Sequence, residues 1–211
     1  MAAIRTVLID TFIDLLVRSL GGIRPSIQLY DTDLHRAYKQ RDYTEMVRLI
    51  RDTLSLDLRI RVGLVNRTSR DAPAWIEMPG AMPQYGTAEF RETQVTVYIK
   101  KSFLREAGYK QVVMMIAHEL SHVVLSSIHH PLQHEEVAVD LTAMLLGFRE
   151  FYCRGVEYQP ILERIVLIVV AIFLRVWISR TRTVGYLTPQ EVRYAGQVMD
   201  MKLNERNGAF R

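Results

Sequence analysis

The chain has 211 residues, of which 49% are hydrophobic and 24% charged, and its formal net charge is +4. These values are typical of a globular protein with a real core, and they exclude a disordered or collagen-like chain. The single cysteine, Cys153, excludes an internal disulfide and a zinc site built from cysteine clusters, and we expect it to be a buried structural thiol. Because the small basic excess is interspersed with acidic residues, we expect no nucleic-acid partner.

The first two predicted elements are helical segments at 3–20 and 33–54. The apolar residues of the first recur at helical spacing, while Asp10 and Asp14 exclude the apolar core of a signal peptide. We expect this helix to dock on the core, with contact to a membrane surface as the alternative. In the second segment, Asp42 precedes a glutamate by three residues, which is the spacing of a capping box.

Alternating apolar residues predict strands at 58–64 and Gln94–Lys100, with a shorter strand at 74–78 among turns. From Tyr109 onward the pattern is helical to the end of the chain. The expected fold class is therefore α+β, with a small mixed sheet in the first half packed on a helical second half.

No internal repeat or flexible linker divides the chain, and we predict one domain over 1–211. It would comprise an N-terminal helical segment (1–54), a central part with the sheet and the chemically active helices (55–150), and a C-terminal helical segment (151–211).

An apolar stretch at 161–178 contains Glu163, Arg164 and Arg175, whereas a spanning helix needs about 20 apolar residues. We predict a buried or interface helix here, with membrane contact as the alternative. The lone cysteine and the missing signal peptide favour a cytoplasmic location, with or without membrane association, and the oligomeric state is left open.

The most informative motif is His118-Glu119-Leu-Ser-His122, an H-E-x-x-H pattern. Four residues make about one helical turn, so both imidazoles project from one face and can bind one metal ion. Glu119 lies on the adjoining face, where it can take a proton from a water at the metal. A chain of this composition contains the motif by chance about 0.01 times. The pattern therefore favours a metal site over a buried helix that happens to carry two histidines.

A second helix is predicted to return toward these histidines after a turn at Pro131, and it carries Glu136 and Asp140. Two histidines and one carboxylate leave a fourth coordination position open, as catalytic zinc requires. Asp140, one turn after Glu136, can accept a hydrogen bond from the far nitrogen of a ligating histidine. Three further histidines lie around the turn and are expected to be surface or loop residues: His129, His130 and His134.

His118-Glu119-x-x-His122 followed by Glu136-x-x-x-Asp140 resembles the gluzincin clan of zinc metallopeptidases, in particular its minimal single-domain members. The resemblance implies a Zn²⁺ cofactor bound by His118, His122 and Glu136. It further implies Glu119 as general base and Asp140 as the residue that orients a histidine.

The resemblance covers about 94–150, and it implies a peptide or protein substrate that extends along Gln94–Lys100 as the edge of the sheet. Only 13 residues separate His122 from the glutamate at 136, fewer than in many members of the clan. Glu135 and Asp140 therefore stay open as alternative third ligands.

A donor that stabilises the oxyanion of a tetrahedral intermediate is not identified by a motif. The candidates are Tyr186, Arg193 and Tyr194, for which packing of the last helix is the alternative role. Thr188, followed by Pro189, predicts the start of that helix.

These patterns together predict a zinc metallopeptidase that hydrolyses peptide bonds with a metal-activated water and Glu119 as general base. The alternative is a non-catalytic, zinc-stabilised regulatory or binding protein, with or without membrane association.

Overall fold

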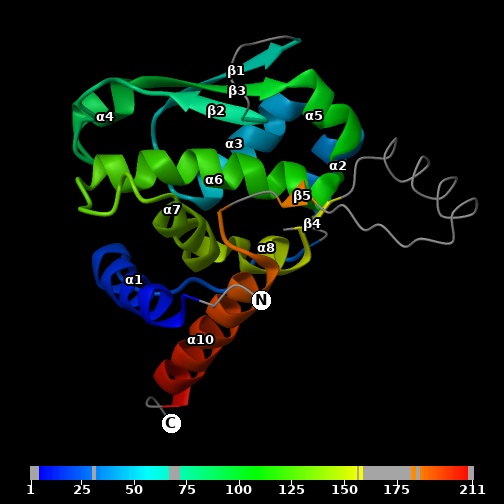
Figure 1. Cartoon of the computed structure of the whole chain (residues 1–211). Coiled ribbons are helices and arrows are strands. Elements are labelled where there is room, and N and C mark those ends of the chain that lie inside the picture. The colour runs from blue at the N-terminus through cyan, green and yellow to red at the C-terminus, as the bar shows by residue number, and fades with distance from the viewer. Residues whose placement is uncertain are drawn as a thin grey trace, which may run out of the picture.

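The computed structural model describes residues 5–29, 32–66, 72–155, 157–158, 182–183 and 186–208. Within these ranges the fold is α+β, as the sequence predicts, with a three-stranded sheet in the first half and a mostly helical second half (Figure 1). The apolar stretch predicted to be a helix at 161–178 lies outside the described residues. No helix in the described part of the chain is long and apolar enough to cross a membrane.

The sheet is mixed, with the strand order β1-β3-β2. β1 (Arg59–Val65) runs parallel to β3 (Gln94–Lys100), while β2 (Ala74–Glu77) runs antiparallel to β3. Val97 is paired with Val62 on one side and with Ile76 on the other. The expectation that Gln94–Lys100 forms the edge is therefore wrong. Alternation shows which face of a strand is buried but not which neighbours it pairs with, and β2 is the edge strand that contacts the long helix below.

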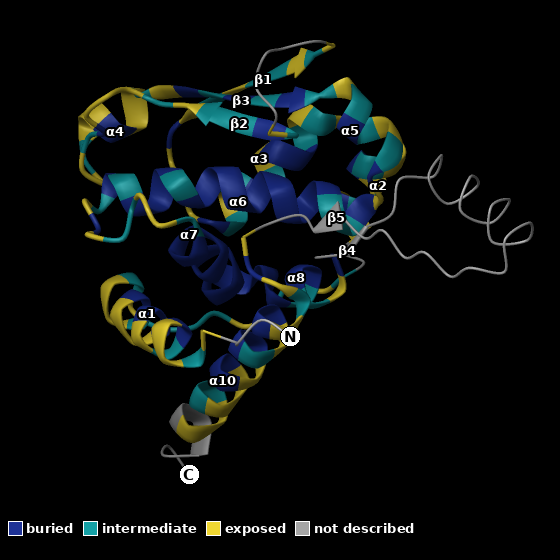
Figure 2. Cartoon of the chain, in the orientation of Figure 1, coloured by how far each residue is buried: buried dark blue, intermediate teal, exposed yellow. Residues whose placement is uncertain are grey.

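That long helix is α6 (Tyr109–Ser127), which runs through the middle of the molecule. The sheet lies on one side of it, and α7 (Glu136–Ala143) and α1 (Thr6–Leu20) lie on the other (Figures 1 and 2). All ten residues from 112 to 121 are buried, including the first histidine and the glutamate of the H-E-x-x-H motif. A helix buried on every side holds its polar side chains rigidly, and it requires that each of them find a partner.

The helical segment predicted at 33–54 is two helices, α2 (Thr32–Lys39) and α3 (Tyr43–Thr53). The chain turns between them at Arg41, whose φ of 56° lies in the left-handed region. Asp42 then caps α3 as predicted, because its carboxylate accepts a hydrogen bond of 3.0 Å from the backbone N–H of Glu45.

Four short elements were not predicted, because each is too short to show a hydrophobic period. They are α4 (Ala88–Glu92), α5 (Lys101–Glu106), β4 (Glu157–Tyr158) and β5 (Arg182–Thr183). The two strands pair in antiparallel fashion, which corrects the expectation of a purely helical chain after residue 109.

A bend at Gly147, where the backbone is not helical, separates α7 from α8 (Arg149–Gly155) and lies within the short element η1 (Met144–Phe148). Gly147 has φ of 113°, and a Cβ there would lie 3.1 Å from the carbonyl oxygen of Pro25, so only glycine fits. Because of this bend, α8 folds back beside α6. Its Tyr152 hydroxyl lies 3.0 Å from the Asp140 carboxylate, whereas a straight helix would separate the two residues by about 18 Å.

The last helix, α10 (Pro189–Gly208), begins with the capping box that the sequence predicts. Glu191 accepts a hydrogen bond from the N–H of Thr188 at 2.9 Å, and its own N–H donates to the Thr188 hydroxyl at 3.3 Å. The same carboxylate pairs with the Arg5 guanidinium at 2.7 Å, which ties the start of α1 to α10. The Arg5 hydrogen bond, opposed by burial and assisted by Thr188, lowers the pKa of Glu191 to about 2.

We expect Glu191→Gln to destabilise the fold by about 2 kcal/mol at pH 7, since partial exposure of Arg5 screens the pair. The folded-state pKa lies below the value of about 4.3 in an unfolded chain, so the carboxylate stabilises the fold above pH of about 4.5. This contribution is lost as the pH falls toward 2. In urea denaturation, the difference in free energy of unfolding between the wild type and Glu191→Gln should therefore be smaller at pH 3 than at pH 7. Glu205→Gln, on the exposed side of the same helix, is the matched control and should change stability by less than about 0.5 kcal/mol.

Candidate metal centre

Three side chains from α6 and α7 converge at one point of the structure. His118 and His122 come from successive turns of α6, and Glu136 is the first residue of α7, which packs back along α6. One ligand atom from each lies within 4.8 Å of the other two. Glu136 Oε2 is 3.3 Å from His118 Nε2 and 3.5 Å from His122 Nε2.

The surroundings of Glu136 Oε2 fit a metal ion. This oxygen is buried, yet it accepts no hydrogen bond from any described residue. Three ligand atoms on a tetrahedral zinc, at about 2.0–2.2 Å each, lie about 3.3–3.5 Å apart, which matches both measured separations. A buried carboxylate oxygen without a hydrogen bond is costly unless a cation satisfies it, which makes this oxygen a candidate metal ligand.

Asp140 lies behind the first histidine and is completely buried. Its Oδ1 is 2.8 Å from His118 Nδ1 and accepts a hydrogen bond of 3.0 Å from the Tyr152 hydroxyl. Its Oδ2 accepts the backbone N–H groups of Tyr186 at 2.7 Å and Leu187 at 3.2 Å. Asp140 thus faces the nitrogen of His118 that points away from Glu136, which is the position of a group that orients a metal ligand.

The pKa values of the three side chains are shifted in different directions. Burial opposes a charge on His118, but the Asp140 carboxylate outweighs it and raises the pKa of this ring. Burial and the neighbouring His118 lower the pKa of His122 to about 4, so this imidazole is neutral and its lone pair is free to bind a metal. The two histidines also lower the pKa of Glu136, which keeps the carboxyl ionised.

Glu119 lies between α6 and the edge strand β2, with 7% of its surface exposed. The backbone of Ile76 on β2 provides a hydrogen bond to its carboxylate. Burial nevertheless raises the pKa of Glu119 to about 7, which suits a general base. The side chain lines a cavity of about 270 Å³ together with all three residues of the cluster, and Trp75 and Met78 form part of the wall.

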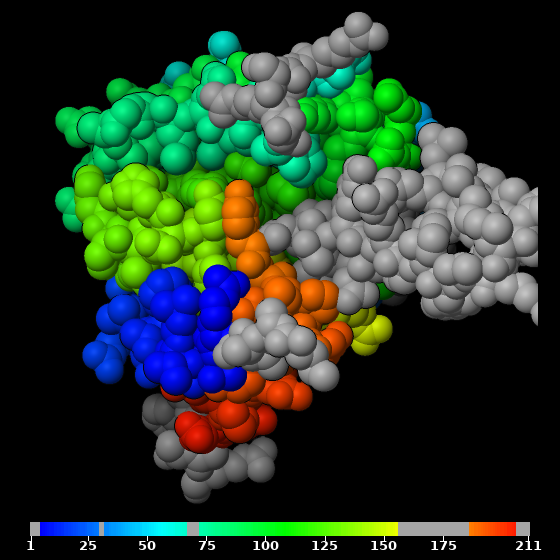
Figure 3. All heavy atoms as spheres, in the orientation of Figure 1, coloured from blue at the N-terminus to red at the C-terminus, as the bar shows by residue number. Residues whose placement is uncertain are grey.

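The three candidates for the oxyanion donor are placed very differently. Tyr186 lines the same cavity, and its ring stacks on His118 with centroids 5.7 Å apart. In the space-filling view, the orange segment that begins at this residue lies on the surface against the yellow-green α6–α7 region (Figure 3). Tyr194 instead donates to Asp10 on α1, and Arg193 is exposed on α10 and does not line the cavity. Of the three, the structure brings only Tyr186 to the site.

The other candidates from the sequence lie away from the cluster. Glu135 is exposed and precedes the first turn of α7, while His130 accepts a hydrogen bond from the Leu132 N–H. His129 and His134 do not line the cavity either. Cys153 is partly buried, and burial raises the pKa of its thiol.

Sequence reasoning did not find Tyr152, the position of the predicted strand β2 beside Glu119, or the two backbone amides that bind Asp140. The hydroxyl of Tyr152 reaches the site only through the bend at Gly147, and no spacing in the sequence indicates that contact. The sequence gives one indication of the two amides: Tyr186 and Leu187 immediately precede Thr188, the predicted N-cap of the last helix.

Comparisons with protein-family models, curated proteins and solved structures gave no match to this chain. The candidate metal centre therefore rests on the chain's own geometry alone: three convergent potential ligand atoms, a buried carboxylate oxygen that lacks a hydrogen bond, and a buried glutamate beside them.

Proposed function

We propose that the chain is a zinc-dependent metallopeptidase of gluzincin type. In this proposal His118, His122 and Glu136 bind the zinc ion, Glu119 is the general base, and Asp140 orients His118. The observation that carries the proposal is the convergence of two imidazole nitrogens on a buried oxygen of Glu136, with the Glu119 carboxylate lining the same cavity.

Zinc supplies Lewis acidity when bound, which lowers the pKa of a water and polarises a carbonyl group. Glu119 accepts the proton of the attacking water and passes it to the amine that leaves when the peptide bond breaks. Tyr186 is the candidate donor to the oxyanion, and burial raises the pKa of its phenol, which keeps the hydroxyl protonated. Asp140 holds the His118 ring in one orientation through Nδ1.

The proposed substrate is a peptide or a protein. β2 forms one wall of the cavity and is an edge strand of the three-stranded sheet. An extended peptide can add to such an edge through backbone hydrogen bonds and so place a peptide bond beside Glu119.

We expect the purified chain to contain one zinc ion per molecule and Glu136→Ala to lose it. Elemental analysis after gel filtration is the measurement. Glu135→Ala is the matched control, because this neighbouring glutamate is exposed and outside the cluster, and it should retain the metal.

Loss of zinc in Asp140→Ala with retention in Glu136→Ala would make Asp140 the ligand and move the protein to another branch of zincins. Absence of zinc from the wild type after reconstitution would contradict the proposal altogether. Zinc retained without turnover of any peptide in a broad library would support the alternative of a non-catalytic, zinc-stabilised protein.

A further inference from the structure

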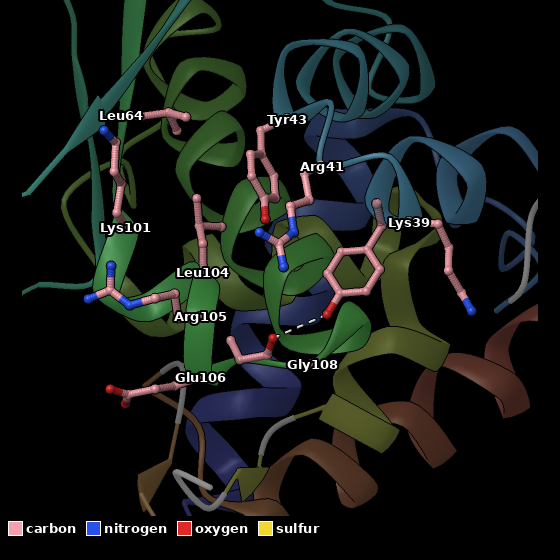
Figure 4. Close-up of a pocket in the computed structure, with 11 residues that line it drawn as sticks. Lys39, Arg41, Tyr43, Leu64, Lys101, Leu104, Arg105, Glu106 and Gly108 are labelled. Atoms are coloured by element: carbon pink, nitrogen blue, oxygen red, sulfur yellow. Dashed lines mark hydrogen bonds between the residues drawn. The ribbon is translucent and has the colours of Figure 1, made fainter. Parts of the chain in front are cut away.

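A second cavity, of about 900 Å³, lies apart from the metal centre, between the α2–α3 turn and α5 (Figure 4). It shares no lining residue with the cavity at Glu119. Gly108, the N-cap of α6, lies at its border, and the helical rise places His118 about 15 Å further along that helix. The volume is within the range of pockets that bind small molecules.

The cavity is strongly cationic. Lys39 and Arg41 line it from the end of α2 and the α2–α3 turn, and Lys101 and Arg105 line it from α5; all four are exposed, and Glu106 is the one acidic residue in the lining (Figure 4). None of the four cations forms an ion pair with a residue in the described ranges. Cations gathered from two sides without counter-charges create a positive potential, to which the N-terminal end of α6 adds.

Arg41 occupies a position that favours glycine. The N–H of Arg41 donates to the carbonyl of Tyr38, and the N–H of Asp42 donates to the carbonyl of Ala37. This pair of hydrogen bonds ends α2 in a way that requires a left-handed residue at Arg41. An arginine there costs stability, yet this exposed residue lines the cavity together with Tyr43 (Figure 4). A strained residue that places a cation in a cavity is typical of a binding site.

The walls of the cavity are partly apolar. The rings of Tyr38 and Tyr43 line one side, and Leu64 and Leu104 line the other. Such a surface can hold the uncharged part of a ligand while the cations bind its charged part. Arginine and lysine from opposite sides suit a ligand with several anionic groups, and the arginine fork matches phosphate in particular.

We propose that this cavity binds a small molecule with two or more phosphate groups. Arg41, Lys101 and Arg105 would bind the phosphates, while Tyr43 and Leu104 would contact the rest of the ligand. This site is separate from the metal centre and does not depend on the peptidase proposal.

Isothermal titration calorimetry of the full chain with ATP, inorganic tripolyphosphate and adenosine tests the proposal. We expect both phosphate compounds to bind and adenosine alone not to, with affinity that falls as salt rises. Lys101→Gln/Arg105→Gln should lower the affinity at least about tenfold, because it removes two charged contacts. Arg59→Gln/Arg61→Gln removes the same charge from exposed positions of β1 outside the cavity and should leave binding unchanged.

A second pair of variants separates binding from folding. Arg41→Gly should raise the melting temperature, because glycine suits a φ of 56°, while it weakens phosphate binding. Ser55→Gly, at another left-handed position outside the cavity, should also raise the melting temperature but leave binding unchanged.

Polyphosphates also chelate metal ions, so the titration is repeated with the near-isosteric Glu136→Gln. Binding that disappears in this variant, yet survives in Lys101→Gln/Arg105→Gln, would belong to the metal centre and overturn the proposal, as would the absence of any binding. Tighter binding of ATP than of tripolyphosphate would assign the cavity to a nucleotide. Equal affinities would assign it to the phosphate chain alone.

Discussion

Glu119→Gln is expected to lower kcat/KM for a peptide that the wild type cleaves by about 10³-fold, while one zinc ion stays bound. A general base contributes on the order of 10²–10⁴ to such a reaction, and glutamine cannot accept the proton of the attacking water. The exchange preserves the shape of a side chain that is 7% exposed, so the fold and the three ligand residues should be undisturbed. Steady-state kinetics on a substrate found by library screening, together with zinc analysis, provide the measurement.

Two controls make the Glu119 result specific. Glu135→Gln carries the same chemical change at an exposed position outside the cavity and should cleave the peptide at the wild-type rate. His122→Ala should lose both zinc and activity, since it removes a ligand. If Glu119→Gln retained full activity with zinc bound, the assignment of the general base would be wrong.

Asp140→Asn should destabilise the fold by about 3 kcal/mol and weaken zinc binding about 10–100-fold. The carboxylate receives two donors on each oxygen: His118 and the Tyr152 hydroxyl on one, and the amides of Tyr186 and Leu187 on the other. In asparagine one of these oxygens becomes an NH₂ group, which would face donors and leave buried groups unsatisfied. Urea denaturation of the metal-free chain and competition with a zinc chelator measure the two effects separately.

The matched control for Asp140→Asn is Tyr152→Phe. It removes a single hydrogen bond from the same carboxylate and retains the buried ring, so it should cost about 1 kcal/mol. It should also change zinc affinity less, because the contact between Asp140 and His118 persists. Wild-type stability in Asp140→Asn would show that this carboxylate does not organise the site.

The parts of the site that the sequence predicts are those determined by one helix and one turn. The spacing of His118 and His122 requires only that α6 be helical, and Glu136 needs only a helix that returns after a short connection. Likewise, the caps at Asp42 and Thr188 depend on residues three positions apart. Local hydrogen bonding and helical periodicity determine these features, so they can be read from the chain alone.

The remaining features depend on contacts between distant segments. The pairing of β3 on both sides, which makes β1 and β2 the edges, depends on how three strands meet rather than on the pattern of any one strand. The contact of Tyr152 with Asp140 depends on a bend whose glycine is required by the backbone of Pro25. Neither the strand order nor the bend leaves a period in the sequence, which is why both were missed.

The hydrogen bonds to Asp140 also determine when the site can be completed during folding. Its partners are 22, 12, 46 and 47 residues away along the chain. Contacts of such long range form late, because the loops they close must first lose their conformational freedom. The two histidines lie on one face as soon as α6 is helical. The rigid orientation of His118 forms only after the chain around Leu187 has docked. In a chain made from its N-terminus, that segment emerges from the ribosome long after α6, so a nascent chain would contain the two histidines before it could fix their final orientation.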